Sequence, residues 1–437
     1  MNRILFSILA FTFSLPWIPV QGEGEAQWPR FRGPNGSGLS HSGTAPVSFD
    51  VEKAWWSVEI PGAGHGSPVI HGDRLFLLSA VPESREDSPS GKTKGKGKGK
   101  AKGGATAYRW LALCLDRNTG ETLWSKEFDQ GKFKGHRFNS AASSTAAADG
   151  DRVVFAWGTA ESLTVVSLTH KGEMQWQSDL GPVVGGHGFG GSPMLYRDLV
   201  VINNDQEKQN GNLLALSAET GEVAWEVERR SERISYSVPC LYEVDERELL
   251  VFTNWQHGFT AIDPADGSVV DEKSVFYLET NERAISSPIV TRGLVIGTCG
   301  FTANPKHCVA MKLTEGKWEE VWRVERSVPH IPSVIAVGDH TYLIDDSGIA
   351  TCLETSTGES LWMKRIPEVE GAIMGSPVSD GTNLFFADES GNLHVLAASP
   401  EFTPRGMSRL GEPCRTTPAL VDGALYLRTE KTLWAFR

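Results

Sequence analysis

The sequence predicts an all-β fold, an eight-bladed β-propeller of four-stranded blades, with seven blades as the alternative count. Three observations support this prediction: a Ser-Pro phrase that recurs along the chain, a second phrase that ends in Trp, and an N-terminal strand that completes the last repeat. The composition agrees, because 46 Gly and 14 Trp among 437 residues suit many short strands joined by tight turns. An all-β ring of this length can form one unit rather than two or three domains.

The first phrase consists of Ser or Thr, Pro, apolar residues, a turn with Gly or Asp, and a β-rich run. Its clear copies begin at Ser67, Ser192, Ser287, Ser376 and Thr417, and looser copies begin at Ser144, Val238 and Ser333. Successive copies start 41 to 49 residues apart, except for a first spacing of 77. A repeat of about 40–50 residues that holds four short strands is typical of a propeller blade.

The second phrase is a hairpin that follows each first phrase, as in LALCLDRNTGETLW, LLALSAETGEVAW and IATCLETSTGESLW. The Gly in its turn permits a positive φ, and a strand returns after it. Six Trp occupy the matching position in this strand: Trp56, Trp124, Trp176, Trp225, Trp322 and Trp362. We expect these rings to pack between neighbouring blades, with each ring N–H bonded to a backbone carbonyl.

The last repeat ends at residues 432–437 with three strands and no returning one. The segment EKAWWSVEI (Glu52–Ile60) resembles the Trp-bearing returning strands of the other repeats. We therefore predict that this N-terminal strand completes the last blade and closes the ring, which leaves no unpaired end.

The N-terminus predicts export, with a signal peptide at 1–24 and a mature propeller domain at 25–437. Arg3 precedes an apolar run from Ile4 to Val20, and small residues follow. The alternative, a membrane anchor, is disfavoured because Pro16 and Pro19 interrupt the short run, and no later segment is long enough to span a membrane. We expect the protein in the periplasm or outside the cell.

The net charge is −12, from 42 basic and 54 acidic residues, and it argues against a general nucleic-acid binder. A Lys/Gly-rich insertion at 83–107 accounts for the long first spacing and predicts a disordered loop. We favour the interpretation that this segment is a tolerated surface insertion without a function of its own. The alternative is contact with an anionic polymer, lipid head group or cell-wall component.

Six Cys are present, and an exported chain can form disulfides. Cys299 and Cys308 flank a short loop and are the best candidate pair. Cys114 and Cys352 occupy repeat positions where other copies carry Ala, so we expect them to be small core residues. No CxxC or adjacent Cys pair occurs, which weakens metal and redox interpretations of the cysteines.

The segments CLDRNTGETLW and ALSAETGEVAW resemble the tryptophan-docking repeat of the pyrroloquinoline-quinone (PQQ) propellers. WPRFRGPNGSGLS, residues 28–40, is similar to the start of exported bacterial PQQ-like repeat proteins. The resemblance covers most of the chain and implies the propeller fold. It leaves function open, because the family includes quinoprotein dehydrogenases, which hold PQQ with calcium, and a non-enzymatic propeller that assists outer-membrane protein assembly.

Ligands of propellers usually bind where the innermost strands begin, around the central channel. The polar residues that precede these strands are His65, His136, Arg137, His187, Arg233, Tyr236, Glu282, Arg283, His330 and Arg415. Three interpretations remain open. The set can line a wet channel, it can hold an anionic or quinone-like small molecule through its arginines, or the four His can bind a transition metal.

Catalysis has no positive signal, because the sequence lacks GxSxG, HExxH, P-loop and dinucleotide motifs and the adjacent-Cys pair of quinoprotein dehydrogenases. Asp205 and Glu282 are possible acids, and Asn203, Asn204 and Asp205 could coordinate a hard cation, although a polar turn is favoured. We therefore predict a monomeric scaffold that binds a small molecule or an envelope protein. The alternatives are a PQQ- and calcium-dependent oxidoreductase and an outer-membrane protein assembly factor, the latter weakened by the absence of a lipid-attachment Cys.

Overall fold

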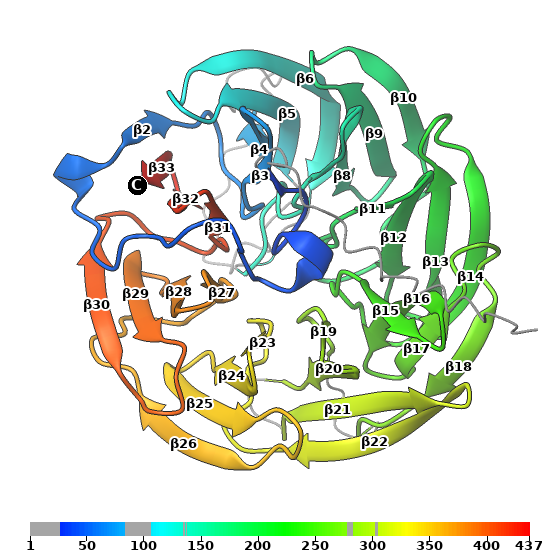
Figure 1. Cartoon of the computed structure of the whole chain (residues 1–437). Coiled ribbons are helices and arrows are strands. Elements are labelled where there is room, and N and C mark those ends of the chain that lie inside the picture. The colour runs from blue at the N-terminus through cyan, green and yellow to red at the C-terminus, as the bar shows by residue number, and fades with distance from the viewer. Residues whose placement is uncertain (1–26, 84–105, 134–135, 137, 278–282, 302–304) are drawn as a thin grey trace, which may run out of the picture.

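The computed structural model describes residues 27–83, 106–133, 136, 138–277, 283–301 and 305–437. In this part of the chain, 33 strands form eight antiparallel sheets that stand around a central axis (Figure 1). The predicted eight-bladed propeller is confirmed, with four strands in seven sheets and a fifth strand added to the first.

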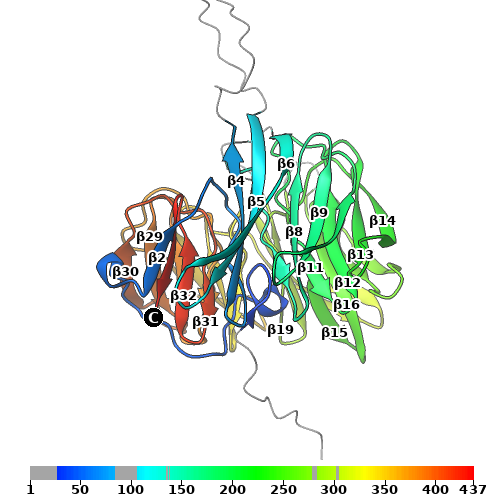
Figure 2. The same ribbon diagram turned by 90° about the horizontal axis from the view of Figure 1, so that it is seen from above.

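The first four blades follow one another along the chain, and each begins with the strand nearest the channel. Their strands are β1 (Gln27–Trp28), β3 (Val69–His71), β4 (Arg74–Pro82), β5 (Thr106–Asp116) and β6 (Thr122–Phe133) in blade 1; β7 (Ala147–Ala148), β8 (Arg152–Gly158), β9 (Leu163–Thr169) and β10 (Met174–Asp179) in blade 2; β11 (Met194–Tyr196), β12 (Leu199–Asp205), β13 (Asn210–Ser217) and β14 (Val223–Ser231) in blade 3; and β15 (Cys240–Val244), β16 (Arg247–Asn254), β17 (Gly258–Ile262) and β18 (Val269–Lys273) in blade 4. Strands β4 to β6 extend beyond their neighbours at one rim (Figure 2).

The remaining blades repeat this order, and two short 3-10 helices, η1 (Pro34–Gly36) and η2 (Val51–Lys53), lie in the N-terminal segment. Their strands are β19 (Ile289–Thr291), β20 (Leu294–Cys299), β21 (His307–Thr314) and β22 (Lys317–Val324) in blade 5; β23 (Ile335–Val337), β24 (His340–Ile344), β25 (Ile349–Glu354) and β26 (Ser360–Arg365) in blade 6; β27 (Val378–Ser379), β28 (Asn383–Ala387), β29 (Asn392–Ala397) and β30 (Pro404–Arg409) in blade 7; and β31 (Ala419–Val421), β32 (Ala424–Arg428), β33 (Thr432–Phe436) and β2 (Trp56–Glu59) in blade 8. No helix in the described part of the chain is long and apolar enough to cross a membrane.

The N-terminal strand closes the ring as predicted. Strand β2 pairs antiparallel with β33, with Trp56 opposite Ala435 and Glu59 opposite Thr432. Blade 8 therefore takes three strands from the C-terminus and its outermost strand from the N-terminus. The pairing joins the two parts of the chain that would otherwise leave an open edge.

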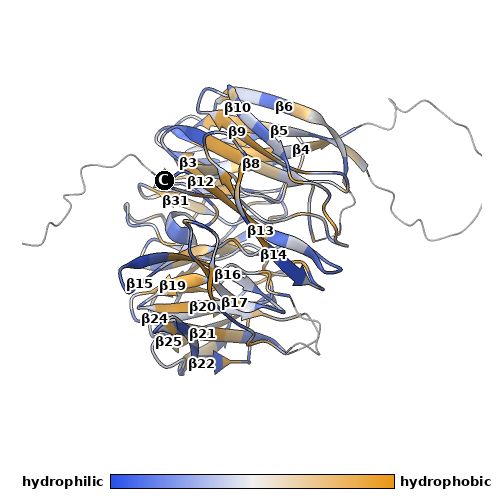
Figure 3. Cartoon of the chain, turned by 90° about the vertical axis from the view of Figure 1, so that its right-hand side faces the viewer, coloured by the Kyte–Doolittle hydropathy of each residue, from blue (hydrophilic) through white to orange (hydrophobic). Residues whose placement is uncertain are grey.

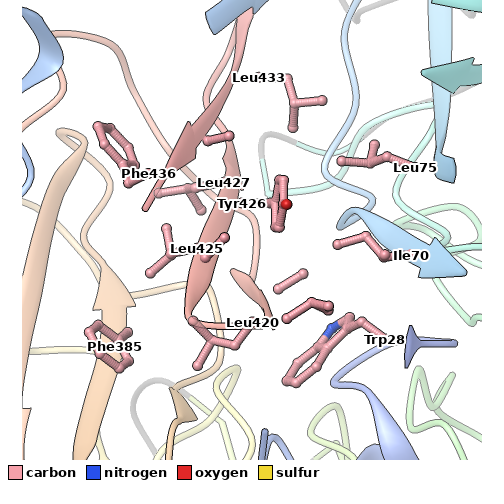
Figure 4. Close-up of a cluster of buried hydrophobic side chains, with 14 of the residues drawn as sticks. Trp28, Ile70, Leu75, Phe385, Leu420, Leu425, Tyr426, Leu427, Leu433 and Phe436 are labelled. Carbon is pink, nitrogen blue, oxygen red and sulfur yellow. The ribbon is translucent and has the colours of Figure 1, made fainter. Parts of the chain in front are cut away.

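The hydrophobic core lies between the blades rather than in one central cluster. Each buried cluster joins side chains of adjacent sheets, as where Phe385 of blade 7, Leu420 and Tyr426 of blade 8, and Ile70 of blade 1 lie together (Figure 4). Inner strands such as β8 are almost wholly buried, whereas the outer strand β14 alternates buried with exposed residues. Figure 3 shows the matching difference in hydropathy, with β8 mainly hydrophobic and β14 carrying hydrophilic stretches. Burial between sheets supplies the main driving force for closure.

Five of the six repeated Trp dock on the next blade as predicted. Their ring N–H groups donate to backbone carbonyls at 2.8–2.9 Å, and each ring lies against the turn glycine of the neighbouring hairpin; these Trp are Trp56, Trp124, Trp176, Trp225 and Trp322. Trp362 differs, because the next hairpin carries no such glycine, and its ring packs edge-on against Phe402 at 5.2 Å. The rings are therefore packing elements of the propeller.

The Ser or Thr of the first phrase forms a hydrogen-bonded ring around the channel. The backbone N–H at seven blade starts donates to the hydroxyl at the next start at 2.9–3.1 Å; the starts are Ser67, Thr145, Ser192, Val238, Ser287, Ser333, Ser376 and Thr417. The missing link runs from Ser192 to Val238, which has no hydroxyl. Blade 2 starts at Thr145, one residue after the predicted Ser144, because Thr145 supplies the hydroxyl of this blade to the ring.

Residues 27–45, which we name the N-terminal plug, cross one end of the channel (Figure 1). Strand β1 adds to the inner edge of β3, and Leu39 bridges Ser379 of blade 7. Asn35 exchanges two hydrogen bonds with the backbone of Leu241, at 2.7 and 2.9 Å. The plug thus ties blade 4, where the hydroxyl ring is broken, to the opposite side of the propeller.

The candidate disulfide between Cys299 and Cys308 is wrong. Cys299 lies opposite His307 in the β20–β21 ladder, and Cys308 lies opposite Thr298. Adjacent positions along a strand point to opposite faces, so the two thiols belong to different inter-blade clusters and cannot bond to each other. Cys114 and Cys352 are buried core residues, as predicted. The signal peptide and the core of the Lys/Gly insertion lie outside the described residues.

Candidate functional site

A cavity of about 750 Å³ occupies the channel mouth opposite the plug, where the chain enters the innermost strands. Seven of the ten predicted site residues line it: His65, His136, His187, Tyr236, Arg283, His330 and Arg415. Arg137 and Glu282 lie outside the described residues. Arg233 is not among the residues that line the cavity, and the hydroxyl of Ser231 bonds both the N–H and the carbonyl of Arg233.

The connections between the second and third strands of blades 5 and 6 supply wall residues that sequence reasoning missed. Phe301 and Lys306 come from the β20–β21 connection, and Asp346 comes from the β24–β25 turn. In an antiparallel blade, the chain returns to the same face after two strands, so these turns lie beside the segments that precede the first strand. This geometric rule, applied to the repeats, would have found them.

Three cations face the cavity, and each has an acidic partner. Arg283 bonds Glu207 at 3.3 Å, Lys306 bonds Asp346 at 2.8 Å, and Arg415 pairs with Glu389. Only Asp346 among the three acids is part of the wall. Two of the three carboxylates are therefore not part of the wall, and cationic side chains outnumber acidic ones among the described wall residues.

Two of the cavity histidines, His65 and His187, have lowered pKa values, which favour the neutral imidazole. Burial lowers the pKa of His65 to about 4, with further lowering from Arg415 and Arg428. Burial also lowers the pKa of His187, and His136 and Arg283 lower it further. The rings of His136 and His187 lie 4.1 Å apart between centroids. Neutral imidazoles can donate and accept hydrogen bonds, which complements the permanently charged guanidinium groups.

Aromatic and apolar side chains form the rest of the wall. The rings of Phe301 and His330 are edge-on, with their centroids 5.9 Å apart. The Cζ atom of Arg283 lies over the Phe301 ring, 5.7 Å from its centroid. Tyr236 donates to the carbonyl of Gly188 at 3.0 Å, and burial raises the pKa of its phenol. A ligand with a flat apolar body and anionic substituents matches this mixture of surfaces.

Three further guanidinium groups are buried around the channel without an acidic partner among the described residues. Arg30 and Arg32 of the plug donate to carbonyls of blades 4, 6 and 7, and Arg428 donates to Leu78 and Ser79. Burial lowers the pKa of these groups to about 10, 9 and 10, respectively. Their charge persists at neutral pH, so the channel is positive although the whole chain is acidic.

The metal interpretation of the four His is not supported by their placement. All four line the cavity, but no three His, Cys, Asp or Glu side chains among the described residues form a metal-binding group. The favoured prediction of a polar turn at Asn203, Asn204 and Asp205 is wrong, because these residues form the end of strand β12. The carboxylate of Asp205 is buried and accepts hydrogen bonds from Arg229 at 3.3 Å and Asn254 at 2.8 Å, so it balances a protein cation.

The residues present fit PQQ better than they fit its calcium ion. PQQ is a planar quinone that carries carboxylates, and Arg283, Lys306 and Arg415 could bind these groups. Calcium needs six to eight oxygen ligands. Asp346 is the acidic side chain in the described wall, and its oxygens already accept bonds from Lys306, His330 and Ile331.

Comparisons with known proteins agree with this architecture. A family model described as outer membrane protein assembly factor BamB matches residues 111–364. Among solved structures, BamB from Moraxella catarrhalis has a TM-score of 0.59 at 13% identity, covering 87% of this chain and 98% of its own. A europium-containing methanol dehydrogenase has a TM-score of 0.52 at 12% identity, covering 94% and 98%.

A computationally designed protein, Ika8, has a TM-score of 0.56 at 10% identity and covers 88% of this chain and 99% of its own. At such identities these likenesses concern the fold alone, since an assembly factor, a dehydrogenase and a designed chain share it. A search of the curated proteins gave no match.

Proposed function

This chain belongs to the PQQ-like repeat β-propeller family, and we propose that it is an exported binding protein whose channel mouth holds an anionic, ring-containing small molecule. The observation that carries this proposal is the 750 Å³ cavity, in which Arg283, Lys306 and Arg415 face inward. Two of their three carboxylate partners, Glu207 and Glu389, are not part of the wall. The uncompensated arginines of the channel add positive potential that attracts anions.

The ligand contacts follow from the two kinds of wall. Arg283 and Arg415 would bind carboxylates with charge-assisted hydrogen bonds, while Phe301 and Tyr236 would cover an apolar ring. Such a site binds without needing a nucleophile or a general base. PQQ is one member of the expected ligand class, and aromatic polycarboxylates are others.

The proposal is tested by melting the exported chain with benzene-1,3,5-tricarboxylate and with PQQ, each with and without Ca²⁺. We expect a raised melting temperature that does not need Ca²⁺, because ligand binding stabilises the folded state. Arg283→Gln should weaken binding about 10- to 100-fold, as one charge-assisted hydrogen bond is lost. The matched control is Arg292→Gln, since Arg292 pairs with Asp339 on the surface outside the cavity. The absence of any shift with these anions would contradict the proposal.

A quinoprotein oxidoreductase is the first alternative, and it shares the cavity. It requires dye reduction with alcohols or sugars in the presence of PQQ and Ca²⁺. Binding of PQQ without turnover would support the binding protein, and Ca²⁺-dependent turnover would support the enzyme.

A role in envelope protein assembly is a second alternative, supported by the family description. The outermost strands end their sheets, and several carry exposed apolar side chains, including Leu123, Val223 and Leu361. An exposed strand edge can pair with an extended segment of another chain. Recovery of outer-membrane proteins on the immobilised chain would support this role, and recovery of no envelope protein would count against it.

A further inference from the structure

His65 and Arg415 stand at the junction of two cavities. They line the 750 Å³ cavity and also a second cavity of about 210 Å³, which lies between blades 8 and 1. The smaller cavity also contains Thr416, Thr429 and Glu430 in its wall. A group that binds between His65 and Arg415 can therefore be reached from both spaces.

The backbone holds His65 firmly at this junction. Its N–H bonds to the carbonyl of Ala142 and the hydroxyl of Ser140, both at 3.0 Å. A side chain at Gly66 would collide with the carbonyl of Ser144, since an added Cβ would lie 2.4 Å away. These contacts fix the backbone of His65 at the junction. No side chain or carbonyl of the described residues bonds its ring nitrogens, which leaves them to a ligand or water.

The charges that act on His65 come from three elements. Arg415 precedes β31, Arg428 ends β32, and Glu389 lies in the β28–β29 turn. Glu389 is paired with Arg415, and Arg428 has no acidic partner among the described residues. Burial and two guanidiniums therefore disfavour the imidazolium form, and Glu389 opposes them only in part.

We propose that His65 and Arg415 form a proton-coupled anion subsite, in which a compact carboxylate or sulfate-like group binds between them as His65 takes one proton from solvent. The inference rests on the proposed binding function. It adds the residues that contact one anionic group of the ligand and a dependence of ligand affinity on pH. The anion bonds the guanidinium of Arg415, and its charge stabilises the imidazolium of His65. Binding is thus linked to protonation, and affinity rises as the pH falls.

The size of the effect follows from the two protonation states of His65. Without ligand, the pKa of His65 is about 4. An anion within hydrogen-bond distance raises a histidine pKa by roughly 1–3 units. With a rise of about 2 units, affinity at pH 5 exceeds that at pH 7.5 about tenfold.

The test is calorimetric titration of the whole exported chain with sulfate at pH 5, 6 and 7.5. Sulfate is the probe because it remains a dianion throughout this range, so any pH dependence belongs to the protein. We expect about tenfold tighter binding at pH 5, and proton uptake seen as a heat that varies with the buffer's ionisation enthalpy. His65→Gln should bind with little pH dependence, while His340→Gln, a change on β24 at a distance from the cavity, should behave as wild type.

NMR titration of His65 with and without sulfate gives a second measurement that needs no variant. A raised pKa in the bound state supports the subsite. An unchanged pKa, or equal pH dependence in wild type and His65→Gln, overturns the subsite but leaves the proposed function standing if tricarboxylates bind. Failure of sulfate and all aromatic carboxylates to bind overturns both.

Discussion

The two ends of the central channel use the same residue type for opposite purposes. At the plug, Arg30 and Arg32 are at most 5% exposed and direct their donors to backbone carbonyls of several blades. At the mouth, Arg283 and Arg415 remain partly exposed, pair with carboxylates, and line a cavity. Burial and partner type, rather than the residue itself, separate the structural cations of the plug from the cations that we propose to bind a ligand.

The difference has a physical origin. A buried guanidinium loses its water and needs replacement acceptors, and backbone carbonyls near the blade starts accept from Nη1 of Arg30 and Nη2 of Arg32. A partly exposed guanidinium keeps part of its hydration and is stabilised by its carboxylate. Stability should therefore depend on the plug, and ligand affinity on the mouth.

The largest expected effect is on stability at the plug. Arg32→Ala removes the bonds to Val334 and Pro377 and leaves a cavity, so we expect a loss of roughly 2–4 kcal/mol in unfolding free energy. The same change at the mouth, Arg415→Ala, should cost under about 1 kcal/mol, because its ion pair is partly solvated. Urea and thermal unfolding measure both. Equal losses of unfolding free energy in the two variants would contradict the division into structural cations at the plug and less buried cations at the mouth.

The next effect concerns acid stability at the mouth. The pKa of His65 is about 4 in the folded chain and roughly 6.5 when unfolded, so the unfolded state binds more protons between these values. Stability that is present above pH 6.5 is therefore lost as the pH falls toward 4, by roughly 2–3 kcal/mol from this group. His65→Gln should lose that much less stability between pH 7 and 4. A parallel pH profile in wild type and variant would contradict this.

The smallest effect tests how the plug compensates for the gap in the hydroxyl ring. Asn35→Ala removes two bonds to the backbone of Leu241, with an expected cost of about 1–2 kcal/mol. Asn118→Ala is the control, because Asn118 bonds Asp73 on the surface. Denaturant midpoints compare the two variants, and sulfate affinity should remain unchanged in both. A cost no greater than the control's would show that Asn35 does not support blade 4.

Much of the fold could be predicted from local repetition. The Trp phrase located the outer strands, and Glu52–Ile60 revealed the closing strand, since each carries its pattern in consecutive residues. The predicted disulfide between Cys299 and Cys308 was wrong, because two residues close in sequence were paired although their side chains point to opposite faces of the sheet. Sequence reasoning also missed Lys306 and Asp346, which reach the mouth only because the antiparallel blade returns to the same face.

The sequence by itself determined the number of blades, their closure and seven residues of the cavity wall, because each repeat encodes its own strands and turns. Only the tertiary structure decided which charges act together. Arg32 meets Val334 and Pro377, and His65 meets Arg415 and Arg428, across hundreds of residues. Such contacts depend on how the blades are arranged around the axis, and burial at that axis sets whether a cation supports the fold or faces a ligand.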